Sequence, residues 1–280
     1  MKNSARILAV YLICAAIIQL AFGDFPVAAF AFPVNAAVLF AGLAGVWVLH
    51  REAPGSRLSV WLSSGSTSIL LLAALLVSCL VMGIVPQDSG ESGFPGLKHI
   101  VHTWWFIAIA LALVANLAMV ILTRRADLRF CLNHIGILLA LAGGFFGAPD
   151  TEILRSAVYR DTPSREAFQP NGSREVLGYE LSMLDFTIEE DENGGVRNYA
   201  ADIMVGNEKA RIRVNSPFRR TAFEDIYLVS YDRASESPRY CVLEIVRQPW
   251  KYVIWSGVVM MMAGAVLMFA RGSRKKEVEV

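Results

Sequence analysis

Six stretches of about 20 mostly apolar residues dominate the sequence, and each is long enough to cross the hydrocarbon core of a bilayer. Only 18% of the residues are charged, against about 25% in an average soluble domain. We therefore expect an α-helical integral membrane protein with six transmembrane helices. The predicted spans are Ile7–Phe22, Phe25–Leu49, Ser66–Val85, Thr103–Leu122, Arg129–Gly147 and Trp250–Ala270.

Lysine and arginine residues indicate the orientation of these spans, because the cytoplasmic loops of membrane proteins are enriched in both. With the N-terminus inside, the basic clusters fall on the cytoplasmic side, and the short outer loops keep only Lys98. We expect both termini to be cytoplasmic and residues 148–249 to be extracytoplasmic. The inner clusters are Lys2/Arg6, Arg51/Arg57, Arg124/Arg125/Arg129 and Arg271/Arg274/Lys275/Lys276.

The polar segment 148–249 shows strand patterns after a loop-like start. Glu180–Glu190 alternates apolar and polar residues, and Val196–Val205 follows a turn sequence as its hairpin partner. These runs predict a small antiparallel β-rich extracytoplasmic domain, folded as a sandwich or a partial barrel. Further β-rich runs are Ala210–Val214, Asp225–Tyr231 and Tyr240–Val246.

The expected organisation has four parts. Residues 1–57 form an N-terminal transmembrane hairpin and a cytoplasmic link, and residues 58–147 contain three transmembrane helices. Residues 148–249 form the outer domain, and residues 250–280 form the last helix and a basic cytoplasmic tail. In the hairpin, Pro26 and Pro33 are expected in the first turns of the second helix, where proline is tolerated.

Several classes of chemistry lack their sequence signatures. There is no glycine-rich phosphate loop, no GxSxG, no HExxH and no redox dithiol. The four cysteines have no metal-ligand spacing. No basic patch with interleaved aromatic residues is present, which argues against a nucleic-acid partner. Six spans permit a small-molecule transporter, but no discontinuous paired helices or intramembrane carboxylates favour one.

Histidines are the candidate ligands of the chain. His134 is an ionisable side chain inside the fifth apolar span, which is costly unless the group is paired or ligated. A neutral imidazole there could ligate iron through one nitrogen and donate a hydrogen bond through the other. The alternative is a hydrogen bond to a neighbouring helix. His99 and His102 would share one helix face at the outer interface, where haem ligation, proton handling and simple solvation all remain open.

Four glycines follow His134 in the same span. They would let another helix, or a flat ring such as a porphyrin, approach the backbone closely, and the sequence does not separate the two. These residues are Gly136, Gly143, Gly144 and Gly147.

The order of several short motifs resembles the ResB-like (CcsB-type) proteins of the system II cytochrome c biogenesis pathway. The resemblance extends from about Arg57 to Ala270 and leaves the first hairpin outside it. The motifs are Leu62–Ser64, Gly83–Gln87, Trp104–Phe106, His134–Gly136, Val214–Phe218, Ile226–Tyr227, Ser230–Asp232, Leu243–Val246 and Pro249.

This resemblance implies a haem-handling subunit of a cytochrome c synthase complex in the bacterial cytoplasmic (inner) membrane. Such proteins work with a CcsA-type tryptophan-rich membrane protein, help to export haem and present it for attachment to apocytochrome c. In the family, a histidine in the span before the outer domain is an axial ligand of a membrane-embedded haem b, shared with the partner. The matching residue is His134. Nothing in this sequence resembles the tryptophan-rich segment, so the chain would be at most a subunit of the haem lyase.

Haem propionates need compensating charge, and Arg124, Arg125 and Arg129 are the candidates nearest to His134 in the sequence. Their alternative role is to set the membrane orientation. A second functional hypothesis is a non-catalytic assembly or docking protein, whose outer β-domain binds a partner without haem ligation.

Overall fold

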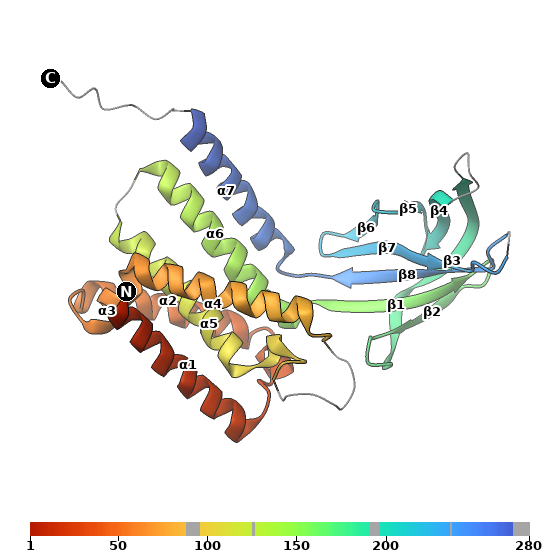
Figure 1. Ribbon diagram of the computed structural model, residues 1–280. Helices are drawn as coiled ribbons and strands as arrows, with labels where there is room; N and C mark the ends of the chain where they lie inside the picture. Colours follow the sequence, from red (N-terminus) through yellow and green to blue (C-terminus); the bar gives the residue numbers. More distant parts are fainter. Residues whose placement is uncertain (88–95, 125–126, 191–195, 236, 271–280) are drawn as a thin grey trace. The chain divides into compact units, whose positions relative to one another are not determined.

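The computed structural model describes all residues except 88–95, 125–126, 191–195, 236 and 271–280. The chain divides into two compact units, Met1–Pro149 with Trp250–Val280, and Asp150–Pro249. Helices build the first unit and strands build the second (Figure 1).

In the described residues of the helical unit, six helices are long and apolar enough to cross a membrane. This confirms the predicted helical membrane fold. The α-helices are α1 (Lys2–Phe22), α2 (Val34–Glu52), α3 (Arg57–Ser63), α4 (Gly65–Ile84), α5 (Trp104–Thr123), α6 (Leu128–Gly147) and α7 (Lys251–Ala270), of which α3 is too short to span. Short 3₁₀ turns are η1 (Val27–Phe30), η2 (Ile100–His102) and η3 (Ala148–Asp150).

The second span begins later than expected. The predicted start was Phe25, whereas α2 begins at Val34 and residues Val27–Phe30 form η1. Pro26 lies just before η1, and Pro33 is the residue before the first turn of α2. Because proline has no amide hydrogen and disfavours helical geometry in the residue before it, the two prolines divide this segment. The placement of both prolines inside one helix was wrong.

Helix α5 is the centre of the helical unit. In its apolar stretch of 18 residues, 61% of the residues are buried, against 28% or less in the other spanning helices. Helices α1, α2, α3, α4 and α6 all contact it. Two buried asparagines tie distant segments together. Asn116 Nδ2 donates to the carbonyl oxygen of Leu62 at 2.6 Å, and Asn35 Nδ2 donates to that of Phe146 at 2.7 Å. Such amide contacts between helices replace the hydrogen bonds that water would supply elsewhere.

Helices α6 and α7 pack at unusually short range (Figure 1). A Cβ built on Gly136 would lie 2.6 Å from the carbonyl oxygen of Gly257 and 2.6 Å from the amide nitrogen of Met261. Backbones can approach this closely only where no side chain intervenes. Gly143 also meets α7 residues, and Gly147 meets Trp250, just before α7. Close helix packing, rather than contact with a flat ring, therefore accounts for these three glycines.

Replacing Gly136 with alanine is expected to destabilise the helical unit by about 1–3 kcal/mol, because the new methyl group overlaps the α7 backbone. The measurement is the free energy of unfolding of the purified chain in mixed detergent micelles. Gly144→Ala is the matched control, since a Cβ there meets no atom within 4 Å and alanine favours helix. Equal stability of the two variants would contradict the packing described for Gly136.

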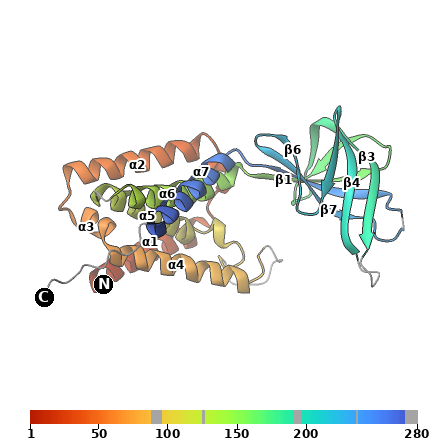
Figure 2. The same cartoon turned by 90° about the horizontal axis from the view of Figure 1, so that it is seen from above.

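The second unit is one antiparallel sheet of eight strands in the order β5-β4-β3-β2-β1-β8-β7-β6. The terminal strands of this order come together, since β5 contacts both β6 and β7, and the sheet curls around its own core (Figure 2). The strand pattern predicts either a sandwich or a partial barrel, and this curled sheet is a partial barrel. The strands are β1 (Glu152–Tyr159), β2 (Ser164–Phe168), β3 (Arg174–Glu190), β4 (Val196–Val205), β5 (Glu208–Arg213), β6 (Phe218–Thr221), β7 (Glu224–Tyr231) and β8 (Tyr240–Arg247).

Alternating residues on the inner face of the sheet form the core of this unit. β1 and β8 pair along their whole length, from Glu152 opposite Arg247 to Tyr159 opposite Tyr240. The two strands that connect to α6 and α7 along the chain are therefore direct neighbours in the sheet. The largest fully buried side chains here are Leu154, Leu177, Leu181, Met183, Ile203, Ile212, Ile226, Leu243 and Ile245.

Candidate functional site

The start of α6 is shaped by one aspartate. The Asp127 carboxylate accepts a hydrogen bond from the backbone amide of Phe130 at 3.2 Å and thereby caps the helix. It also accepts a hydrogen bond from Arg129 Nε at 2.8 Å. Because the arginine is already paired within its own turn, its charge is largely neutralised where α6 begins.

His134 lies about one turn further along α6. Its Nδ1 is 3.0 Å from the carbonyl oxygen of Phe130, and its ring stacks on the Phe130 ring with centroids 3.8 Å apart. A carbonyl oxygen only accepts, so this contact assigns the proton of a neutral imidazole to Nδ1. The Nε2 atom then carries the lone pair, and none of the described residues hydrogen bonds to it. An imidazole held in this way has the tautomer and the fixed ring orientation that metal-ligating histidines show.

His134 faces the interior of the helical unit and not α7. Leu138 and Leu141 follow it on the same side of α6, and both pack against the buried core around α5. Its neighbour Asn133 instead lies against Gly264 of α7. A cavity of about 370 Å³ lies between the first turn of α6 and the last turn of α7, but His134 does not line it. The histidine is half-buried, at the end of the core-facing side of its helix.

The three candidate arginines differ in availability. Arg129 is paired with Asp127, as described above. Arg124 ends α5, is exposed and makes no ion pair with a described residue. Its guanidinium lies beside Gly65, the first residue of α4. Arg125 lies outside the described residues. Of the two described, Arg124 is therefore the cation still available to an anionic group near this end of α6.

His99 and His102 lie at the other end of α5, around η2. Their rings are nearly parallel, with an angle of 9° and centroids 6.0 Å apart. The 20 residues of α5 separate them from the segment that leads to His134, a rise of about 30 Å. One bound haem therefore does not reach both places. The structure brings His99 and His102 together and separates them from His134.

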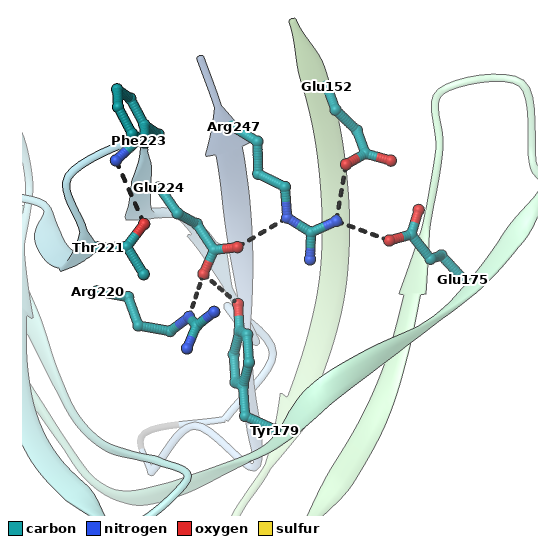
Figure 3. A network of polar contacts seen from close by, with 8 residues as sticks. All are labelled: Glu152, Glu175, Tyr179, Arg220, Thr221, Phe223, Glu224 and Arg247. Carbon is teal, nitrogen blue, oxygen red and sulfur yellow. Dashed lines mark hydrogen bonds and ion pairs between the residues drawn. The ribbon is translucent and has the colours of Figure 1, made fainter. Parts of the chain in front are cut away.

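A polar network in the β-unit was not predicted from the sequence. Arg247 at the end of β8 is its centre, with Nε donating to Glu224 at 2.7 Å. Its Nη1 donates to Glu152 at 2.7 Å and to Glu175 at 2.8 Å (Figure 3). The network thus connects strands β1, β3, β7 and β8 at the end of the sheet where β1 begins and β8 ends.

Glu224 is the most buried carboxylate of this network, with only 5% of its side chain exposed. It accepts a hydrogen bond from the Tyr179 hydroxyl at 2.9 Å and pairs with Arg220, whose guanidinium lies 4.1 Å from the Tyr179 ring centroid (Figure 3). Burial alone would raise the pKa of Glu224, but the hydrogen bonds from Arg247, Arg220 and Tyr179 outweigh it and hold the pKa below its usual value.

Neighbouring groups also shift the pKa values of Glu152, Glu175 and Arg247. Burial and a hydrogen bond with Glu175 raise the pKa of Glu152, and the same hydrogen bond lowers the pKa of Glu175. Burial opposes the charge of Arg247, but its three carboxylate partners raise its pKa. Every charged group in Figure 3 is paired with another in this network. The arrangement is suited to holding strands β1, β3, β7 and β8 together.

Comparison with known proteins gives one family match. Residues 128–238 match the ResB-like family, a range that contains His134 and strands β1 to β7. No curated protein matches the chain. Among solved structures, the chain is similar to Cytochrome c Heme Lyase CcmF, with 14% sequence identity and a TM-score of 0.36. That similarity covers 94% of this chain and 44% of the other, so the chain spans less than half the length of that protein.

Proposed function

Because residues 128–238 match the ResB-like family, we propose that the chain handles haem within a system II cytochrome c synthase complex. Its role in this proposal is to help export haem and to present it for covalent attachment to apocytochrome c. A CcsA-type tryptophan-rich membrane protein is the proposed partner, and the bacterial cytoplasmic membrane is the proposed location.

The observation that carries this proposal is the geometry of His134. Its Nδ1 is engaged by the carbonyl oxygen of Phe130, so Nε2 has the lone pair that haem iron requires. The ring is fixed by stacking on Phe130, which reduces the entropy lost when a ligand binds. Arg124 is the described cation available to a propionate near this end of the unit. The residues present therefore fit one face of a haem, whose iron would be the group to which the imidazole binds.

The chain supplies only part of such a site. His134 does not line the cavity at the start of α6, and the glycine-lined side of α6 is occupied by α7. A haem ring bound at Nε2 would therefore use neither of these two places, and the proposed site needs to be completed from outside this chain. We propose that the CcsA-type partner covers it and supplies the second axial ligand.

The orientation in this proposal has both termini in the cytoplasm. Arg124, Arg129, Arg6 and Arg57 then all lie on the inner side, as the enrichment of basic residues in cytoplasmic loops requires. His134 would bind haem in the inner part of the membrane, and the β-unit would face the compartment where apocytochrome c receives its haem.

The test is the absorption spectrum of the full chain, purified alone and together with a co-expressed CcsA-type partner. The complex is expected to show a Soret band, and the chain alone is expected to show a much weaker one, because half of the proposed site is missing. A complex that assembles but remains colourless would overturn the haem-handling role. It would leave the assembly or docking role of the β-unit as the better account.

A further inference from the structure

An apolar groove lies in the N-terminal part of the helical unit. A cavity of about 380 Å³ is lined by residues of α1, α2, α3 and α5 and by Phe146 of α6. A second cavity of about 230 Å³ adjoins it and shares Tyr11, Val38 and Leu111 with it. The Tyr11 hydroxyl donates to the carbonyl oxygen of Ala108 at 3.1 Å, so the polar atom at this junction is already satisfied. The two cavities together offer a continuous apolar surface, which we call the hairpin groove.

The hairpin groove is open to the surroundings of the helices. Four apolar residues that line the larger cavity are each more than a third exposed, Ile7, Val38, Leu58 and Leu111. In a membrane these surroundings are lipid chains. The acyl chain of a lipid can therefore enter the groove from the side without any movement of the helices.

A polar chamber of about 570 Å³ adjoins one end of the groove and shares Ile7 and Trp61 with it. Arg6 of α1 and Arg57 of α3 line this chamber, together with Asn3, Ser4 and Ser64. Neither guanidinium makes an ion pair with a described residue. Two positive charges from separate helices thus stand beside the entrance to an apolar groove, and the described part of the chain does not neutralise them.

We propose that the hairpin groove and the polar chamber bind one anionic phospholipid. An acyl chain occupies the groove, and the phosphate lies between Arg6 and Arg57. The charge of the chamber selects an anion, because basic pockets between transmembrane helices bind anionic head groups. The volume of the larger cavity is within the range of small-molecule sites, about 300–1,000 Å³.

The larger cavity of the groove does not suit haem. Of the side chains that line the larger cavity, only that of Tyr11 is of a type that ligates haem iron, and its hydroxyl is engaged with Ala108. Except for Phe146, the residues that line the groove and the chamber also lie outside residues 128–238, so the site does not rest on the proposed haem function. It gives the first two helices a task that the ResB-like segment does not explain.

The first test removes the charge. The full chain is purified from bacterial membranes, stripped of lipid with detergent and titrated with phosphatidylglycerol or phosphatidylcholine, and bound lipid is counted by native mass spectrometry. The variant Arg6→Gln/Arg57→Gln is expected to lose about tenfold in phosphatidylglycerol affinity and little in phosphatidylcholine affinity. Arg51→Gln is the matched control, because Arg51 ends α2, pairs with Glu52 and does not line the chamber.

The second test fills the groove and keeps the charge. A Cβ on Gly42, which lines the larger cavity, meets no atom within 4 Å, so the side chain of Gly42→Leu is expected to extend into the space of the acyl chain. It is expected to reduce phosphatidylglycerol binding at least tenfold. Gly45→Leu, on the same helix, is the control, since it also meets no atom within 4 Å and lines neither cavity.

Three results would overturn the proposal. The first is equal binding of the two lipids by the unaltered chain. The second is unchanged phosphatidylglycerol binding in both the arginine and the Gly42→Leu variants. The third is a protein helix in the groove, detected when a photoreactive side chain at position 42 cross-links in membranes to another polypeptide instead of to lipid.

Discussion

Replacing His134 with alanine is expected to remove most of the haem that co-purifies with the assembled complex. The imidazole is the proposed axial ligand from this chain, and alanine offers no atom in its place. The contact of Nδ1 with the Phe130 carbonyl shows that the ring is already oriented, so its loss removes a prepared ligand. The measurement is the ratio of Soret absorbance to protein absorbance in the purified complex, and we expect it to fall at least tenfold.

Two further variants separate ligation from folding. His50→Ala is the matched control, because His50 is a histidine near the end of α2 that the proposal does not use. His134→Gly supplemented with free imidazole should recover part of the Soret band, since the small molecule can replace a missing ligand but cannot repair a misfolded helix. A complex that keeps its full haem content after loss of His134 would remove this residue from the site. A stable complex without rescue would point to a packing role.

Replacing Arg247 with methionine is expected to be the most damaging single change in the β-unit. Glu224, Glu152 and Glu175 would lose their shared partner, and the side chain of Glu224 is 95% buried. Breaking a buried ion pair by removing one partner costs about 3–5 kcal/mol, and we expect the lower part of this range because Arg220 and Tyr179 still contact Glu224. This is a large part of the stability of a typical domain. We expect rapid proteolysis within residues 150–249 of the full chain under conditions where the unaltered protein resists.

Arg155→Met is the matched control for this change. Arg155 also pairs with a glutamate, Glu244 at 2.9 Å, but 65% of its side chain is exposed. Exposed pairs contribute about 0–1 kcal/mol, so proteolysis should hardly change. The double variant Arg247→Met/Glu224→Gln should recover part of the resistance, because it removes a buried charge that has lost one of its two arginine partners. If Arg247→Met and Arg155→Met are digested at the same rate, the network around Arg247 does not stabilise the β-unit.

The helices could be predicted because the bilayer requires a length that apolar runs reveal directly. The elements that were not predicted, α3, β1, β2 and β6, need no long apolar run. Helix α3 is only seven residues long, and the sequence pattern predicts no helix between the second and third spans. Among the strands, β2 and β6 are short and mostly polar, with Ala167 the one buried residue of β2. In β1 the inward position between Leu154 and Val158 is Ser156, which interrupts the apolar alternation.

The candidate site was predictable only in part. A single ionisable residue in an apolar run identified His134, but no pattern predicts which nitrogen its own helix engages. The pairing of Arg129 with Asp127 likewise depends on side-chain geometry. The network around Arg247 did have a sequence pattern. Glu224 is two residues before Ile226, so the strand pattern predicts that both side chains lie on the inner face. A charged side chain on that face needs a partner.

The β-unit is an insertion between two helices that are already in contact. A Cβ on Gly147, the last residue of α6, would lie 2.5 Å from the side chain of Trp250, just before α7. Within the β-unit, the first and last strands are paired from Glu152 opposite Arg247 onward. Both ends of the inserted segment are thus held side by side by its own sheet. A tight turn could therefore replace all hundred residues of it and still close the helical hairpin, which makes the β-unit of this protein exchangeable without rebuilding its helical unit.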